Sequence, residues 1–501
     1  MEFFILLISA IVAYMATSII YRKVLKLAKV RNVMDNPNER KLHDAPVPVL
    51  GGMAVFFGIL AGLLAAGVFF VQFVDMDKMV GELSVGSSIC DLLPVLLAAS
   101  ILLFTGCVDD LIGLSPLFRL IVEILAITGL CLCSDMCVDS FFGLFGITTF
   151  SRWIGLPLTV FVGVGIINAY NMVDGVDGLS SGLCITVAPI IIWLFQKRND
   201  WVDATLVACY MASLIPFFMH NVFGKKSRMF IGDAGTMVMG LLLTWCVIKT
   251  LSSNGVMSNM KETDPDAVMC LPAMLFSIAS VPVMDTLRVI VLRKMCGKSA
   301  FMADRRHLHH KFVDSGISHS VTSLSEIVMN LLVVLAWYVS YKSGLWQMGQ
   351  LIVTLTVAMV LVWGTYLFLD KKNSYNTWIV KMMKNFTVIS HLEGKPVWKR
   401  MQKLLDKGTY EDLTEIVMHR LGREGQELSE NDMDVINIMN FMQDKNKVYV
   451  TDIVKSLNID NVSVQSILVE LERNGLIQVL ASEEDGSIIK LTLCRKVVFD
   501  E

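Results

Sequence analysis

Long apolar runs, separated by short polar stretches, fill the first three quarters of this 501-residue chain. Each run is about 20 residues long, which is the length that an α-helix needs to cross a hydrocarbon layer roughly 30 Å thick. About eleven such runs follow one another from residue 3 to residue 369, and they stop after residue 370. The pattern predicts an all-α polytopic membrane domain of about 11 transmembrane helices over residues 1–370.

Composition and charge sharpen this picture. Hydrophobic residues make up 54% of the chain, which excludes an ordinary soluble enzyme. One set of loops, at 21–48, 222–232 and 291–322, holds 16 Lys and Arg residues. The intervening loops hold only 6, and they lie at 74–90, 134–156, 196–203, 254–266 and 342–347. Because basic loops stay in the cytoplasm, we expect the first set to be cytoplasmic and the N-terminus to lie outside.

The tail differs from the rest of the chain. Residues 371–430 read as a polar helical connector, and residues 431–501 show three helical segments followed by two apolar strands around a polar turn. This order is similar to a winged helix-turn-helix, an α+β domain, with Ser463 as an expected helix cap. Residues 421–501 carry 8 Lys or Arg against 15 Asp or Glu. Since DNA binding requires basic charge, we expect this cytoplasmic domain to contact protein rather than nucleic acid.

Polar stretches interrupt the apolar pattern where the inward-running spans end, so all of them face the cytoplasm in this topology. The third span ends in GCVDDLIGLSP, which contains Asp109 and Asp110. A carboxylate in the middle of a bilayer costs about 2.5–3.5 kcal/mol, so an acidic pair at a span end indicates a function. Adjacent helical residues point about 100° apart, and we expect one acid to face a metal and the other a substrate. The alternative is a solvated span terminus.

A second polar stretch, NMVDGVDGLSSG, ends the fifth span. Asp174 and Asp177 are three residues apart, and Asn171 lies three residues earlier, so all three share one face if the segment is helical. Each aspartate precedes a glycine, which lets a backbone approach a ligand closely. We expect Asn171 to orient a phosphate or sugar group. A glycine-rich interhelical turn is the alternative.

Two further stretches lie on the same predicted face. Asp233 in FIGDAGT opens the next helix, where a carboxylate is also a good N-cap. The stretch DRRHLHHKF offers dense hydrogen-bond donors for phosphate oxygens. Those donors are Arg305, Arg306, His307, His309 and His310. A zinc site is the rival interpretation of the histidines, but no cysteine or glutamate lies at suitable spacing.

Acids, histidines and arginines thus converge on one membrane face. Mg²⁺ takes oxygen ligands, usually one or two carboxylates together with substrate phosphates, and phosphoryl transfer needs positioning and charge neutralisation. The residues predict a Mg²⁺-dependent enzyme that joins a cytosolic phosphate donor to a membrane lipid. An intramembrane aspartyl protease and a membrane-anchored non-enzymatic regulator, acting through the tail, are the alternatives. Neither would use the acids and the histidines together.

At these residues the chain resembles the polyprenyl-phosphate N-acetylhexosamine-1-phosphate transferases of the undecaprenyl-phosphate GlcNAc-1-phosphate type, which start bacterial cell-envelope glycans. The resemblance covers roughly residues 1–345 and rests on RKLHDAPVPVLGGMA, VDDLIGLSP, NMVDGVDGLSSG, MFIGDAGT and DRRHLHHKF, in the family's order. It implies transfer of HexNAc-1-phosphate from a UDP-sugar to polyprenyl phosphate with release of UMP. It also implies an active site at the cytoplasmic face of the bacterial inner membrane.

The resemblance assigns roles to individual residues. Asp109, Asp110 and Asp233 would be catalytic, with Asp110 and Asp233 as ligands of Mg²⁺ and with Mn²⁺ as a second candidate ion. The nucleotide-sugar site would be lined by Asn171, Asp174 and Asp177. The DRRHLHHKF motif would contact phosphate or sugar through Arg305, Arg306, His307, His309 and His310. The first motif would contribute Lys41 and His43 to substrate binding. We favour direct attack by the lipid phosphate, with Asp109 as base, over a covalent aspartyl intermediate.

Details of the motifs refine these expectations. An apolar residue between the first two histidines favours UDP-GlcNAc as donor, because relatives that transfer phospho-MurNAc-pentapeptide have a differently arranged histidine run. Arg119 stands where many relatives have lysine, so a planar fork replaces a point charge. The winged-helix-like tail is an addition to the family's core. We also expect a homodimer.

Overall fold

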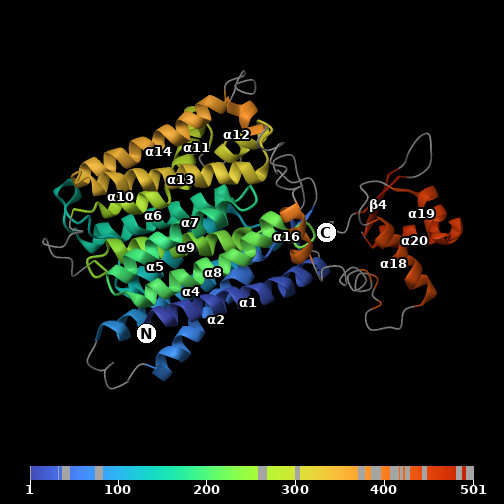
Figure 1. Cartoon of the computed structure of the whole chain (residues 1–501), viewed down its shortest axis with the longest axis horizontal. Coiled ribbons are helices and arrows are strands. Elements are labelled where there is room, and N and C mark those ends of the chain that lie inside the picture. Colours follow the sequence, from blue (N-terminus) through green and yellow to red (C-terminus); the bar gives the residue numbers. More distant parts are fainter. Residues whose placement is uncertain are drawn as a thin grey trace.

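A computed structural model describes residues 2–31, 33–35, 46–73, 83–257, 268–299, 305–370, 379–384, 396–406, 417, 421, 423, 429–442, 448–474, 476–480 and 488–491. The first part of the chain forms a bundle of helices, most of which are long and run side by side (Figure 1). They are α1 (Glu2–Val30), α2 (Gly51–Phe73), α4 (Leu83–Ile112), α5 (Pro116–Ser134), α6 (Arg152–Val173), α7 (Leu179–Lys197), α8 (Trp201–Phe223), α9 (Gly232–Leu251), α10 (Leu271–Ile278), α11 (Ser280–Met295), α13 (His319–Lys342) and α14 (Gln347–Asp370). Shorter elements connect them: β1 (Met34–Asp35), β2 (Val47–Pro48), the 3₁₀ turn η1 (Leu144–Gly146) and α12 (Leu308–Asp314).

The number of membrane-spanning helices agrees with the apolar pattern. Ten helices in the described ranges are long and apolar enough to cross a bilayer, and α10 with α11 makes an eleventh if this bent pair is one span. The prediction of an all-α polytopic membrane protein with about 11 spans is therefore confirmed. The orientation and the boundaries at 1–370, 371–430 and 431–501 stay predictions.

Helix α9 forms the centre of the bundle. Its residues from Ala234 to Leu251 are all buried, and α4, α6 and α2 pack around it. Helix α4 comes close because of Gly106, where a Cβ atom would lie 2.3 Å from the backbone nitrogen of Ala234. Only glycine fits such an approach. The end of α4 that carries the acidic pair therefore reaches the first turn of α9.

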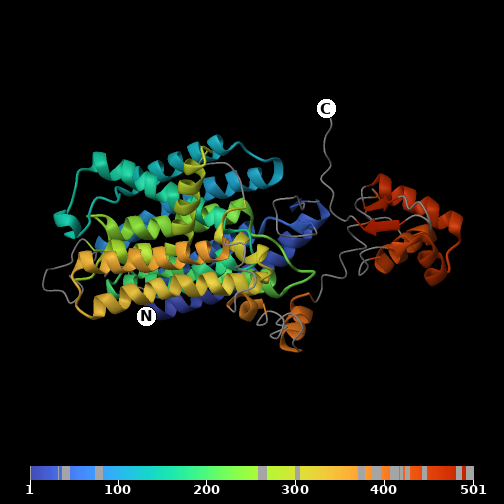
Figure 2. The same ribbon diagram turned by 90° about the horizontal axis from the view of Figure 1, so that it is seen from above.

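The apolar run over residues 271–295 does not form one straight helix. Helices α10 and α11 meet at Ala279 with a bend of 80°, and α11 crosses the bundle at a steep angle (Figure 2). Asn330 in α13 satisfies the interrupted backbone: its Oδ1 accepts from the Val281 N–H at 3.1 Å, and its Nδ2 donates to the Ile278 carbonyl at 3.2 Å. Backbone groups in a bilayer need such partners because water is absent there.

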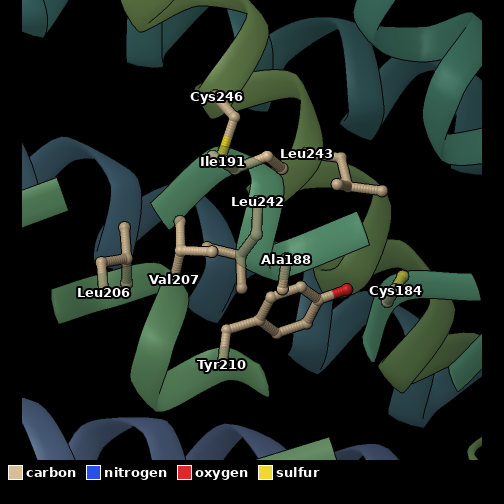
Figure 3. Close-up of a pocket in the computed structure, with 9 residues that line it drawn as sticks. All are labelled: Cys184, Ala188, Ile191, Leu206, Val207, Tyr210, Leu242, Leu243 and Cys246. Atoms are coloured by element: carbon tan, nitrogen blue, oxygen red, sulfur yellow. The ribbon is translucent and has the colours of Figure 1, made fainter. Parts of the chain in front are cut away.

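The interior between α7, α8 and α9 is tightly packed. Figure 3 shows a small gap there, with Cys184, Tyr210 and Cys246 among its lining side chains. The gap measures about 10 Å³, the least volume that holds one water molecule, and its lining is almost wholly apolar. It is therefore a packing gap and not a ligand site.

Helix α16 (Pro396–Leu405) packs against α8 of the bundle. The elements after it form a hydrophobic core of their own: α18 (Glu430–Met442), β3 (Val448–Tyr449), α19 (Val450–Leu457), α20 (Asn461–Arg473), β4 (Ile477–Leu480) and β5 (Ile488–Leu491). The strands pair antiparallel in the order β3-β5-β4. The expected cap Ser463 was wrong: Asp460 caps α20 by accepting from the Val462 and Ser463 N–H groups, each at 2.9 Å. The winged-helix assignment stays a prediction.

Candidate active site

The two acids of α4 meet the N-terminus of α9, but they do so differently. Asp110 accepts the Asp233 N–H through Oδ1 at 2.9 Å and the Ala234 N–H through Oδ2 at 3.4 Å. Gly232 has a φ of +74°, and a Cβ there would lie 2.4 Å from Asp110 Oδ2. Asp109 turns instead toward Arg119. The pair thus serves two different neighbours, as their angular separation on a helix predicts.

Arg119, in the first turns of α5, lies in the middle of the acidic cluster. Its Nη1 lies 2.7 Å from Asp109 Oδ2 and 3.3 Å from Asp233 Oδ2, and its Nη2 donates to Asn171 Oδ1 at 3.0 Å. Asn171 in turn donates to Asp233 Oδ1 and, at 2.9 Å, to Thr236 Oγ1. One planar guanidinium therefore joins α4, α6 and α9, which is a geometry that a single lysine nitrogen does not reproduce.

The aspartates of NMVDGVDGLSSG have separate environments. Asp174 accepts from the Ser180 hydroxyl at 2.6 Å. Burial raises the pKa of Asp174 to about 7; the Ser180 hydrogen bond opposes this shift, and the nearby Asp233 charge adds to it. Asp177 is buried and forms an ion pair with Arg228, and its Oδ2 lies 3.0 Å from His319 Nδ1. The two acids are therefore not equivalent ligands of one centre.

The histidine stretch contacts this turn. A Cβ at Gly175 would lie 2.7 Å from His309 Nε2, so the Asp-Gly sequence leaves room for that ring. Asp285 of α11 holds the stretch in place: its Oδ2 lies 2.8 Å from His307 Nδ1, and it accepts the Leu308 N–H at 3.2 Å.

Burial, together with the neighbouring rings, keeps two of these histidines neutral. It lowers the pKa of His310 to about 4 and that of His309 well below its usual value. Neutral imidazoles donate one hydrogen bond each. His309 and His310 therefore offer hydrogen-bond donors and acceptors near pH 7, rather than fixed charge.

Some predicted site residues lie elsewhere. Arg305 pairs with Asp314 at 2.6 Å, and Arg306 Nη1 lies 3.5 Å from the Cys296 sulfur, so neither is seen in the acidic cluster. Lys41 and His43 lie outside the described residues. The described end of their motif does reach the site: the Gly52 N–H donates to the Ile231 carbonyl at 2.8 Å.

Several residues of this region were not predicted as part of it. Arg228 and His319 face Asp177, Asp285 supports His307, and Glu123 accepts from Asn168 at 2.5 Å. Each of them contacts a partner that is 22 or more positions away in the sequence. Only the presence of a charge within an apolar span, as for Glu123 and Asp285, could have drawn attention to them.

An apolar groove of about 920 Å³ begins beside the acidic cluster. It lies between α5, α6, α9, α10 and α11, and its lining is almost entirely aliphatic or aromatic. Leu120, Asn168 and Met172 line it. Asn168 lies one helical turn before Asn171 and donates to Glu123, which lies one turn after Arg119, so the groove borders the polar cluster.

The cluster is rich in negative charge. Asp109 and Asp233 share the guanidinium of Arg119, whereas Asp110 is bound by backbone N–H groups of α9. Within the part of the chain that the structure describes, no three His, Cys, Asp or Glu side chains form a metal-binding group. Mg²⁺ commonly uses only one or two protein carboxylates and completes its shell with water and phosphate oxygens. The hard oxygen donors of Asp110 and Asp233 fit such an ion.

Comparison with known proteins identifies this arrangement. The model of glycosyl transferase family 4 matches residues 92–251, which contain all the acids of the cluster. A decaprenyl-phosphate N-acetylglucosaminephosphotransferase of Mycobacterium leprae is 30% identical over 325 residues, which are 62% of this chain and 77% of that protein. The chain belongs to glycosyl transferase family 4.

Two further relatives extend the similarity. A probable undecaprenyl-phosphate N-acetylglucosaminyl 1-phosphate transferase of Bacillus subtilis is 26% identical over 357 residues, which are 71% of this chain and 89% of that protein. An undecaprenyl-phosphate alpha-N-acetylglucosaminyl 1-phosphate transferase of Escherichia coli is 28% identical over 306 residues, which are 58% of this chain and 72% of that protein. These relatives confirm the resemblance drawn from the five motifs. They support neither the protease nor the regulator.

Proposed function

We propose that this family 4 member transfers GlcNAc-1-phosphate from UDP-GlcNAc to a polyprenyl phosphate, with undecaprenyl phosphate as the lipid, and releases UMP. The reaction would be the first membrane step of a cell-envelope glycan. The observation that carries the proposal is the contiguity of the acidic cluster around Arg119 with the 920 Å³ apolar groove. A lipid phosphate has the same two parts, an apolar chain and an anionic head.

The groove supports a prenyl chain as the substrate's tail. Its lining carries almost no polar groups, and burying apolar surface gains about 25 cal/mol per Å². A chain that lies along α5 and α6 in the groove brings its head toward Arg119 and Asn171. The guanidinium, which has five donors, suits a phosphate head.

Magnesium would complete the charge balance. Asp110 and Asp233 would hold the ion, which would neutralise the diphosphate of the donor, with Mn²⁺ as a substitute. Asn171 would orient the donor, and Asp174, Asp177 and the histidines His307, His309 and His310 would surround its nucleotide and sugar. Arg119 keeps Asn171 and Asp233 in fixed relative positions, so that these groups need no rearrangement when substrates bind.

The chemical step we favour is a direct displacement. An oxygen of the lipid phosphate forms a bond to the sugar-linked phosphorus, and the bond from that phosphorus to the oxygen of the uridine phosphate breaks, so UMP leaves with the electron pair. Asp109 would accept a proton from the lipid phosphate when that group is still monoprotonated. Since phosphate monoesters lose this proton near pH 6, the base matters most at acidic pH.

We also propose where the reaction takes place. The basic loops favour an inner-membrane protein whose acidic cluster faces the cytoplasm, where nucleotide sugars are available. A homodimer and a protein-binding role of the tail remain our expectations from the sequence.

The test is UMP release by detergent-purified protein supplied with Mg²⁺, undecaprenyl phosphate and UDP-GlcNAc. We expect release to require each component, to stop with EDTA and to return with added Mg²⁺. Asp110→Asn should lose most of the rate, and because an asparagine keeps one acceptor oxygen for the α9 N–H groups, its melting temperature should stay near that of wild type. Absence of release with UDP-GlcNAc and every other UDP-HexNAc would refute the proposal.

A further inference from the structure

The connector helix α16 ends in a carboxylate that is bound by a loop of the membrane domain. Asp406 Oδ1 accepts the N–H groups of Lys226 and Ser227 at 3.1 and 2.9 Å and the Ser227 hydroxyl at 2.7 Å, and Oδ2 accepts the Lys225 N–H at 3.3 Å. Four donors on three consecutive residues surround one side chain. Successive backbone N–H groups of this kind form an anion-binding concavity.

The same loop continues into the active site. The next residue, Arg228, pairs with Asp177 through Nε at 3.1 Å and through Nη2. The Met229 carbonyl accepts from Asn221 Nδ2 at 3.1 Å, and the Oδ1 of Asn221 accepts the Gly178 N–H at 2.7 Å. The backbone then turns at Gly232 into Asp233. Only six positions separate Ser227, which Asp406 holds, from Asp233.

Side-chain packing reinforces this attachment. The Trp398 ring of α16 lies with its centroid 4.6 Å from that of Phe223, at the end of α8, and Trp398 is 9% exposed. Trp398 and Met401 also line a pocket of about 340 Å³, and Asp177 lines the same pocket. Helix α16 therefore touches the pocket that adjoins Asp177 as well as the loop that leads to Asp233; Figure 1 shows it at the end of α8.

The charges of the loop explain why it needs an anion. Lys225, Lys226 and Arg228 bring three positive charges within four residues, and the N–H groups add partial positive charge. Helix α1 binds two carbonyl oxygens of the loop: Tyr21 Oη donates to the Ser227 carbonyl at 2.8 Å and Lys29 Nζ to that of Lys226 at 3.0 Å. Asp406 supplies the acceptor for the N–H groups of the same residues.

We infer that Asp406 is a positioning residue for the transfer reaction: by docking α16 onto residues 225–227, the connector keeps the loop in the conformation that sets Arg228 against Asp177. This inference rests on the proposed function and adds a positioning residue that lies outside the membrane-spanning helices.

The test uses full-length variants. Asp406→Ala removes all four hydrogen bonds, whereas Asp406→Asn retains an Oδ1 that accepts three of them. Asp452→Ala removes an exposed acid of α19 and serves as the matched control. Trp398→Ala weakens the docking of α16 without touching the carboxylate. For each variant we would measure hydrogen exchange of residues 224–231, the Kd for UDP-GlcNAc, and KM and kcat for UMP release.

We expect Asp406→Ala to speed exchange of the loop amides roughly tenfold or more, since hydrogen bonds to charged groups have this strength. In Asp406→Ala the Kd and KM for UDP-GlcNAc should rise by about the same factor, and kcat should change less. Trp398→Ala should also raise the exchange rate, the Kd and the KM. Asp406→Asn should recover most of the loss, and Asp452→Ala should match wild type. A purely structural role would lower the melting temperature without separating KM from kcat.

Three results would overturn the inference. Unchanged loop exchange in Asp406→Ala would mean that the connector does not hold the loop. Faster exchange with unaltered donor affinity would mean that the loop and the donor site are uncoupled, and tighter donor binding would mean that the contact is inhibitory. Wild-type protein that binds UDP-GlcNAc without releasing UMP would refute the proposed reaction alone, because the exchange and Kd measurements would still decide the role of Asp406.

Discussion

Arg119 offers the sharpest test of how the acidic cluster works. In Arg119→Lys, one nitrogen can keep the contact that Nη1 makes with Asp109 at 2.7 Å, but it cannot also reach Asn171, which Nη2 meets at 3.0 Å. One charge-assisted hydrogen bond is lost, worth about 1.5–3 kcal/mol. If that bond orients Asn171 in the transition state, kcat/KM should fall by about 10- to 150-fold.

The assay is UMP release at saturating lipid and varied UDP-GlcNAc, with melting temperatures as a check on folding. Arg119→Ala should be at least another tenfold worse than Arg119→Lys, because Asp109 and Asp233 then lose their only guanidinium in the cluster. Arg152→Lys is the control, since its ion pair with Asp135 is solvent-exposed at the other end of α5 and α6. A rate for Arg119→Lys within threefold of wild type, or equal rates for the two Arg119 variants, would refute the reasoning.

Three further predictions concern other parts of the molecule. The pKa of Asp174 is raised to about 7, so its carboxylate gains a proton as the pH falls through that value. We expect kcat/KM for UDP-GlcNAc to fall over the same pH range. In Asp174→Asn this fall of kcat/KM at acidic pH should be absent. Gly106→Ala should lower the melting temperature and the rate together, since its Cβ would overlap the Ala234 backbone, at a cost of about 1–3 kcal/mol. Asn330→Leu should lower the melting temperature in detergent, because each buried backbone group left unpaired costs about 1–3 kcal/mol. A melting temperature equal to wild type in either of the last two variants would contradict the assigned contact.

The membrane domain was predictable from the sequence because bilayer thickness imposes a length on every span. The break between α10 and α11 was not, since residues 271–295 read as one apolar run with a polar end. The partner that makes the break tolerable is Asn330, on another helix. A local pattern contains no information about such a partner.

The candidate site was likewise predictable from the sequence only in part. The predicted topology placed Asp109, Asp110, Asn171 and Asp233 on one membrane face, and the structure joins these four residues in one network of hydrogen bonds and ion pairs. The pairings themselves were not predictable. Arg228, for example, reads as one more basic residue of a positive loop, and only the fold sets it against Asp177.

The bend at Ala279 places α11 between the apolar groove and the histidine stretch. On one side of α11, Val283, Leu287 and Ile290 line the apolar groove, and on another side Asp285 holds His307. A small rotation of α11 about this hinge would change the width of the groove and the position of the histidines at the same time. The shape of the groove that we propose for the lipid and the geometry of the polar site would therefore change together.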